Sequence, residues 1–102
     1  MTEKNYKNFK EFYPFYLNEH SNSVCRMLHI IGTTLVLLVL IYSLFRSQYY
    51  LLWSLPFIGY GFAWVGHYVF EKNRPATFIY PLYSFMGDWV MWWQVITLKI
   101  KI

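Results

Sequence analysis

Three long apolar blocks, separated by short polar breaks, make up most of the chain. They cover residues 27–45, 49–70 and 78–98, and only the last contains a formal charge, at Asp88. A helix that crosses the hydrocarbon core of a bilayer needs about 20 predominantly apolar residues. The pattern therefore predicts three transmembrane helices, over 25–45, 49–70 and 79–98.

The region before the first block has a different pattern. Aromatic residues and a leucine recur at helical spacing, with polar residues between them: Phe9, Phe12, Tyr13, Tyr16 and Leu17. This spacing predicts an amphipathic helix over 6–19. Such a helix either lies in the membrane interface or packs over the bundle, and the sequence leaves both open. The fold class that follows is all-α: residues 1–102 form one integral-membrane domain of three transmembrane helices plus an amphipathic N-terminal helix.

Composition supports a membrane protein. Hydrophobic residues make up 57% of the chain and charged residues 14%, whereas a soluble domain carries about 25% charged residues. The net charge is +4, but the basic residues flank the apolar blocks instead of forming a stripe, so we expect no nucleic acid partner. The single cysteine, Cys25, excludes an internal disulfide.

The basic residues also predict an orientation. With three spans, one side holds Lys4, Lys7, Lys10, Arg26, Lys72 and Arg74, and the other holds Arg46, Lys99 and Lys101. The positive-inside rule places the richer side, with the N-terminus, in the cytoplasm. The membrane would be the inner membrane of a bacterium or the endoplasmic reticulum of a eukaryote.

All three histidines fall at the same end of the predicted bundle. His29 follows the start of the first span closely, His67 comes shortly before the end of the second, and His20 precedes the first. Because the first two spans are antiparallel, His29 and His67 lie roughly 5 Å below the same surface. Carboxylates lie nearby: Glu71 is four residues after His67, and Asp88 lies within the third span.

Imidazoles and carboxylates suit Fe(II), Zn(II) or Mn(II), and ionisable groups within a membrane usually face a bundle interior or a cavity. We predict a metal site with His20, His29, His67 and Glu71 as ligands. Two alternatives remain open: the histidines are hydrogen-bonded packing residues, or Glu71 is an interface partner of Lys72 or Arg74. Asp88 is a candidate catalytic residue, because a carboxylate inside a span needs a partner.

Three strings resemble one known family. They are "FYPFYLNEHSNSVCRMLHIIG" (12–32), "FAWVGHYVFEKNRPAT" (62–77) and, more weakly, "PLYSFMGDW" (81–89). They are similar to the Mpo-type family of small membrane proteins, whose characterised fungal members are Fe(II)-dependent 2-hydroxy-fatty-acid dioxygenases. The resemblance implies α-oxidation, in which O2 is used to shorten a 2-hydroxy fatty acid by one carbon. It also implies iron binding by the histidines at positions 20, 29 and 67.

The chain departs from the fungal pattern in two ways. Fungal members tend to have a second histidine where this chain has Glu19, and they carry a longer region between the first two strings. Glu19 or Glu71 would then complete the coordination sphere, or the substrate would differ. The short form is also compatible with a homodimer.

The implied substrate fits the predicted membrane placement. Its tail would lie among membrane lipids while its carboxylate and 2-hydroxyl reach the metal near the interface. Arg74 is the candidate for holding the carboxylate, because a guanidinium forks onto a carboxylate, although anchoring in the cytoplasmic leaflet explains it equally well. The alternative function is a non-enzymatic lipid-binding or helix-packing membrane module with structural histidines.

Overall fold

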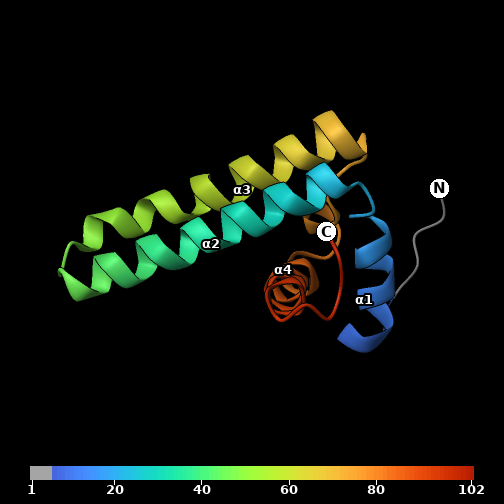
Figure 1. Cartoon of the computed structure of the whole chain (residues 1–102), viewed down its shortest axis with the longest axis horizontal. Helices are drawn as coiled ribbons and strands as arrows, with labels where there is room; N and C mark the ends of the chain where they lie inside the picture. Colours follow the sequence, from blue (N-terminus) through green and yellow to red (C-terminus); the bar gives the residue numbers. More distant parts are fainter. Residues whose placement is uncertain (1–5) are drawn as a thin grey trace.

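The computed structural model of the chain describes residues 6–102, and within that range the regular structure is entirely helical (Figure 1). The predicted all-α fold class is therefore confirmed. In chain order the elements are α1 (Phe9–Asn18), α2 (Ser23–Phe45), the 3-10 helix η1 (Tyr49–Ser54), α3 (Leu55–Val65), the π-helix η2 (Gly66–Glu71), the 3-10 helix η3 (Ala76–Phe78) and α4 (Pro81–Ile96).

A long hairpin dominates the molecule. Its first arm is α2, and η1, α3 and η2 follow one another as its second arm (Figure 1). The side chain of Asn22 caps α2 by accepting hydrogen bonds from the N–H groups of Val24 and Cys25, as a good N-cap residue does. At the turn the Ser43 hydroxyl donates to the carbonyl of Gln48, at 2.8 Å. The second arm starts as a 3-10 helix and becomes α-helical at Leu55, with Pro56 in the first turn of α3, where a missing N–H is tolerated.

The last helix runs across this hairpin. Figure 1 shows α4 along its own axis while α2 and α3 lie across the view. The chain after α4 returns to the start of α2, where Arg26 Nη1 donates to the carbonyl of Lys101, at 2.7 Å. The predicted third span would have put Lys101 at the opposite end of the bundle.

Three side-by-side transmembrane helices are therefore not confirmed. Among the described residues, α2 is the one helix long and apolar enough to cross a membrane. This finding is compatible with membrane association. It does not establish topology or sidedness.

The buried core lies where α1 packs on α4. Phe12 and Tyr16 of α1 are at most 1% exposed, and they belong to the same cluster as Met91 and Val95 of α4. At Gly87 the helices come so close that a Cβ would stand 2.8 Å from the Tyr16 ring, so this position requires glycine. Of the two placements left open for the N-terminal helix, the structure shows packing over another helix.

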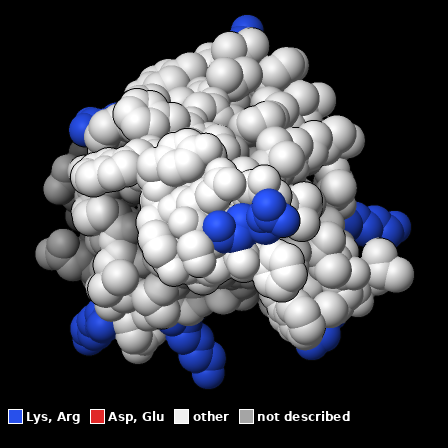
Figure 2. All heavy atoms as spheres, turned by 90° about the vertical axis from the view of Figure 1, so that its left-hand side faces the viewer, with Lys and Arg blue, Asp and Glu red and all other residues white. Residues whose placement is uncertain are grey.

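Outside this core, large apolar side chains cover the hairpin. Phe45, Trp53 and Phe57 are each about 80% exposed, at 83%, 80% and 79%. Figure 2 looks onto the end of the molecule where the hairpin turns, and the visible surface there is almost entirely uncharged, with a few basic and no acidic groups. Apolar surface of this extent marks an interaction site, for a protein or for a membrane.

Candidate metal centre

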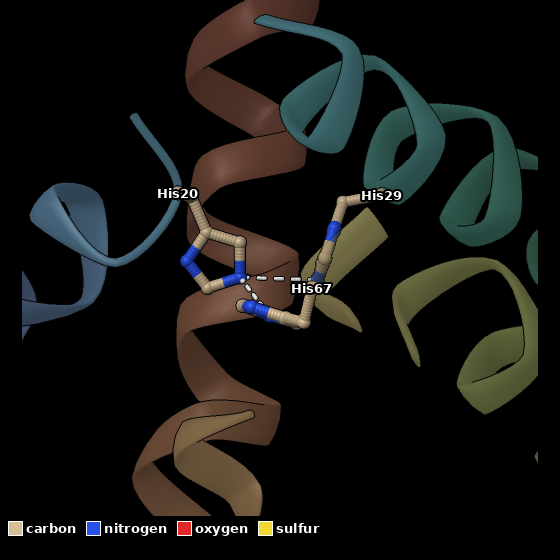
Figure 3. Close-up of side chains that lie close together, drawn as sticks. All are labelled: His20, His29 and His67. Carbon is tan, nitrogen blue, oxygen red and sulfur yellow. Dashed lines mark hydrogen bonds between the residues drawn. The ribbon is translucent and has the colours of Figure 1, made fainter. Parts of the chain in front are cut away.

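The three histidines meet at the base of the hairpin. His20 lies in the link between α1 and α2, His29 lies in α2 and His67 lies in η2. Their rings point toward one another (Figure 3), and all three side chains are buried. His20 Nε2 is 3.0 Å from His29 Nε2 and 3.0 Å from His67 Nε2. The structure thus brings together the three histidines that the sequence analysis groups.

Each imidazole is held in place by a hydrogen bond at its Nδ1 atom. His20 Nδ1 lies 2.7 Å from the carbonyl oxygen of Tyr16, and His29 Nδ1 lies 2.9 Å from that of Cys25. His67 Nδ1 lies 2.7 Å from Asn73 Oδ1. The Asn73 amide is oriented by its nitrogen, which donates to the carbonyl of Glu19 at 3.1 Å. Because carbonyl and amide oxygens only accept hydrogen bonds, all three Nδ1 atoms carry the proton.

This tautomer leaves three Nε2 lone pairs facing a common point. In a neutral imidazole the second nitrogen is an acceptor, so contacts of 3.0 Å between Nε2 atoms bring acceptor against acceptor unless a cation lies between them. A proton is disfavoured there: burial, with the neighbouring His29 and His67 imidazoles, lowers the pKa of His20 well below its ordinary value. The donor set therefore fits a metal ion, since ligating histidines typically present Nε2 to the metal and donate Nδ1–H to an oxygen.

The spacing of the nitrogens also suits a metal. Two imidazole nitrogens, each about 2.1 Å from a bound ion, can lie at most about 4.2 Å apart. The two separations of 3.0 Å, from His20 Nε2 to His29 Nε2 and to His67 Nε2, are within this limit. Three histidine ligands leave coordination positions open for a substrate or O2.

A π-helical turn and a close helix contact position His67. At Gly66 the second arm approaches α2 so closely that a Cβ would stand 3.0 Å from Cys25 Sγ and 3.2 Å from Cys25 Cα. The π-helix η2 ends at Glu71, and the next residue, Lys72, has a left-handed φ of 58°. The N–H of Asn73 then donates to the carbonyl of His67 at 3.0 Å. Single π-turns are frequent at functional sites, and this one brings the Asn73 side chain back onto the His67 ring.

The predicted fourth ligand, Glu71, does not lie in the group. Its carboxylate accepts hydrogen bonds from the backbone N–H of Asn22, at 2.7 Å, and from the Ser21 hydroxyl, at 3.2 Å. The carboxylate therefore ties η2 to the start of α2. The structure brings together the three histidines without Glu71, and Glu71 positions the two elements that carry His29 and His67.

Asp88 faces the same site from α4. It accepts a hydrogen bond from the hydroxyl of the buried Tyr16. The Tyr16 ring in turn stacks on the His20 ring, with 4.0 Å between centroids. Tyr16 thus supports the site in three ways, through its carbonyl, its ring and its hydroxyl. The sequence contained one signal for this role, because Tyr16 lies four residues before His20. The helical spacing of the aromatic residues, however, indicated only that Tyr16 packs in the core.

The arginines lie elsewhere. The Arg74 side chain is exposed, and its guanidinium carbon lies 5.3 Å from the centre of the Phe78 ring, a cation–π contact. The structure does not bring Arg74 to the histidines, so its role in holding a carboxylate remains a prediction. Arg26 binds backbone carbonyls, among them that of His20 at 3.0 Å, and fixes the link that carries this histidine.

A cavity of about 360 Å³ opens beside the histidines, and Tyr16 and Asp88 share its wall with them. Most of the remaining lining comes from apolar residues of α2, α3 and α4. Concave, mostly apolar sites with a few convergent polar groups are the usual form of small-molecule sites.

Comparison with known proteins identifies a family. The family model described as "2-hydroxy-palmitic acid dioxygenase Mpo1-like" matches residues 6–100. No curated protein and no solved structure matches the chain. The match extends over nearly the whole chain and includes the three histidines and the residues that hold them. The chain belongs to the Mpo1-like family.

Proposed function

We propose that the protein is an Fe(II)-dependent dioxygenase that shortens 2-hydroxy fatty acids by one carbon. The observation that carries the proposal is the group of three buried histidines, with the Nε2 atoms of His29 and His67 each 3.0 Å from that of His20, beside a mostly apolar cavity. The description of the family supports the class of substrate and of reaction.

The proposed reaction balances without a further reductant. A 2-hydroxy acid and one O2 give the acid shortened by one carbon, carbon dioxide and water. The C1–C2 bond breaks, C2 becomes the new carboxyl carbon, and the substrate supplies all the electrons that reduce O2. The bound metal would supply Lewis-acid and redox chemistry. Zinc has no redox chemistry, so an oxygenase needs iron or manganese in this site.

The protein residues hold and orient the reactants. Tyr16, Cys25 and Asn73 fix the three imidazole rings through the Nδ1 hydrogen bonds. Asp88, held by the Tyr16 hydroxyl on the cavity wall, is positioned to accept a hydrogen bond from the 2-hydroxyl of a substrate. The apolar lining excludes water, which strengthens these polar interactions.

We further propose that the hairpin of α2 and η1–α3–η2 enters the membrane and that α1 and α4 stay at its base. The exposed apolar side chains of both arms support this placement. The metal centre would then lie near the interface, where an amphipathic acid has its head group. The base would hold every described basic residue except Arg46, which lies at the hairpin turn, and the positive-inside rule assigns such a base to the cytoplasm.

Element analysis of anaerobically purified protein tests the function. We expect a stoichiometric transition metal in the wild type, together with O2-dependent conversion of a 2-hydroxy fatty acid to the acid with one carbon fewer. His20→Ala, His29→Ala and His67→Ala should lose both metal and product. Glu11→Gln is the matched variant, because it alters an exposed carboxylate of α1 that lies outside the cluster, and it should retain the metal.

Two results would contradict the proposal. One is wild-type protein without a transition metal. The other is full conversion by the His67→Ala variant. A fall in thermal stability of the histidine variants, with no metal in any protein, would instead indicate a non-enzymatic membrane module with structural histidines.

A further inference from the structure

The cavity beside the metal centre continues between the two arms of the hairpin. On α2 it is lined in sequence by His29, Thr33, Val36 and Leu40. These residues are three or four positions apart, so they form one stripe on the helix. The facing stripe runs in the opposite direction, from His67 toward Leu55.

One contact fixes how the two stripes face each other. A Cβ at Gly59 would lie 3.6 Å from Val36 Cγ2, so the two arms pack against each other at this level and the cavity passes beside this contact. From position 29 to position 40 the helix advances 11 residues, a length of about 16 Å. The lining therefore extends for about this length along the hairpin, with the histidines at one end.

The other end of the lining lies toward the hairpin turn. Leu40 and Leu55 are the last lining residues of their arms. One turn beyond Leu40, Ser43 is 0% exposed, and its hydroxyl is bound to the carbonyl of Gln48. The two arms thus join shortly beyond the last lining residues.

The histidine end contains a polar group without a partner. Ser84 Oγ on α4 lines the cavity, the residue is 5% exposed, and its hydroxyl has no hydrogen-bond partner among the described residues. A buried polar group left unpaired is destabilising. Its position suits a ligand whose polar head lies beside the histidines.

We infer that this cavity binds a long-chain carboxylic acid in an extended form, with its head between Ser84 and the histidines and its last carbon near Leu40 and Leu55. The inference deepens the proposed function, on which the identity of the head group rests. With C–C bonds of about 1.5 Å, an extended chain advances about 1.25 Å per carbon. A lining of about 16 Å then accommodates about 13 carbons beyond the head, which matches a bound acid of about 14–16 carbons.

Photolabelling tests this without requiring metal or O2. The probes are unhydroxylated saturated fatty acids with a photoactivatable diazirine at the last carbon, one of about 16 carbons and one of about 10. Both are applied to purified protein in detergent micelles, and labelled residues are mapped by mass spectrometry. We expect the long probe to label the region of Leu40 and Leu55, and the short probe the region of Val36 and Tyr60.

Two glycine variants test the path of the acyl chain. One should block the cavity, and the other is its control. Gly59→Leu places a side chain against Val36 in the middle of the cavity, whereas Gly61→Leu, on the same helix, places one where no atom lies within 4 Å. Gly59→Leu should abolish labelling at Leu40 and Leu55, and Gly61→Leu should leave it unchanged. Ser84→Ala should weaken binding of both probes by roughly three- to tenfold, since one hydrogen bond to the head is lost.

The inference is overturned if the long probe labels mainly the outward-facing Leu38, Trp53 and Phe57, as ordinary lipid would. Equal labelling patterns in Gly59→Leu and Gly61→Leu, or unchanged binding in Ser84→Ala, would overturn it too. Metal content and O2-dependent conversion are measured separately on the same proteins. If the proposed function fails, the labelling pattern can still be interpreted. If the labelling fails, the metal content and the conversion can still be interpreted.

Discussion

At the scale of single residues, the centre depends on which nitrogen of each histidine carries the proton. Three oxygen acceptors decide this, two of them backbone carbonyls and one the side chain of Asn73. A side-chain acceptor can be removed by mutation, whereas a carbonyl cannot. Mutation of Asn73 therefore tests most directly whether the hydrogen bonds at Nδ1 decide the tautomer of the histidines.

Asn73→Ala should lower metal affinity by about 10- to 100-fold, the usual effect of losing a partner that orients a ligating histidine. The His67 ring would lose its acceptor at Nδ1 and rotate more freely. Metal competition titrations measure the effect. Asn18→Ala, at an exposed position, serves as the control and should leave the affinity unchanged. Equal affinities in the two variants would contradict the role given to Asn73.

Acid should destabilise the metal-free protein. The ordinary pKa of histidine, 6.5, applies to the unfolded chain, whereas burial and the neighbouring imidazoles lower the pKa of His20 in the folded protein. Below pH 6.5 the unfolded state therefore binds a proton that the folded state does not. The free energy of unfolding falls as the pH falls through this range, and it is insensitive to this group at higher pH.

Thermal unfolding of metal-stripped protein between about pH 5 and pH 8 measures this dependence. The unfolding temperature should fall on acidification, and the fall should be smaller in His20→Gln. A midpoint that is constant or rises toward acid pH would show that His20 is not held neutral by its surroundings.

At the scale of secondary-structure elements, the site depends on how closely η2 approaches α2. That contact lies at Gly66, next to His67, and at Cys25, one helical turn before His29. A change in the separation of these two elements therefore moves two of the three imidazoles relative to each other. Glu71 holds the same pair of elements together through the N–H of Asn22.

Gly66→Ala should separate the two elements and weaken the centre. The new Cβ would stand 3.0–3.3 Å from atoms of Cys25, two of them backbone, and overpacking of this kind typically costs about 1–3 kcal/mol. We expect a lower free energy of unfolding and a lower metal content. Gly61→Ala, which faces open space, should instead stabilise the helix by up to about 1 kcal/mol. Chemical denaturation and element analysis measure both, and a gain in stability in Gly66→Ala would refute the close contact.

At the scale of the whole molecule, the direction of α4 distinguishes two membrane topologies. If the chain crossed the membrane three times, in side-by-side helices, the C-terminal residues would lie on the side of the hairpin turn. The structure instead places Lys101 against Arg26, at the base. A hairpin that enters the membrane alone therefore leaves both ends of the described chain on one side.

Cysteine accessibility in sealed vesicles separates these topologies. In a Cys25→Ala background, single cysteines at Asn18, Tyr49 and Ile102 report the base, the hairpin turn and the C-terminal end without altering any charge. We expect a membrane-impermeant maleimide to label Asn18→Cys and Ile102→Cys from the same side and Tyr49→Cys from the other. Labelling of Ile102→Cys together with Tyr49→Cys would support three spans.

Much of the fold follows from the sequence alone. Hydrophobic periodicity and length predict helices near 6–19, 25–45, 49–70 and 79–98, and the structure is helical in each of these ranges. The antiparallel pairing of the first two blocks places His29 and His67 at one end, because a short break leaves the chain no other arrangement. Helix formation and hairpin pairing depend on local, short-range interactions, so the sequence reports them well.

Tertiary packing decided the rest. The direction of α4 depends on the contact of Gly87 with Tyr16 and on the bond between Arg26 and Lys101, and no periodicity in the sequence encodes such distant partners. The same holds for Glu71, whose carboxylate accepts a hydrogen bond from the N–H of Asn22, and for Ser84, whose unpaired hydroxyl lines the cavity. The sequence determined which side chains were available for the chemistry, whereas only the folded chain determined which of their atoms face one another.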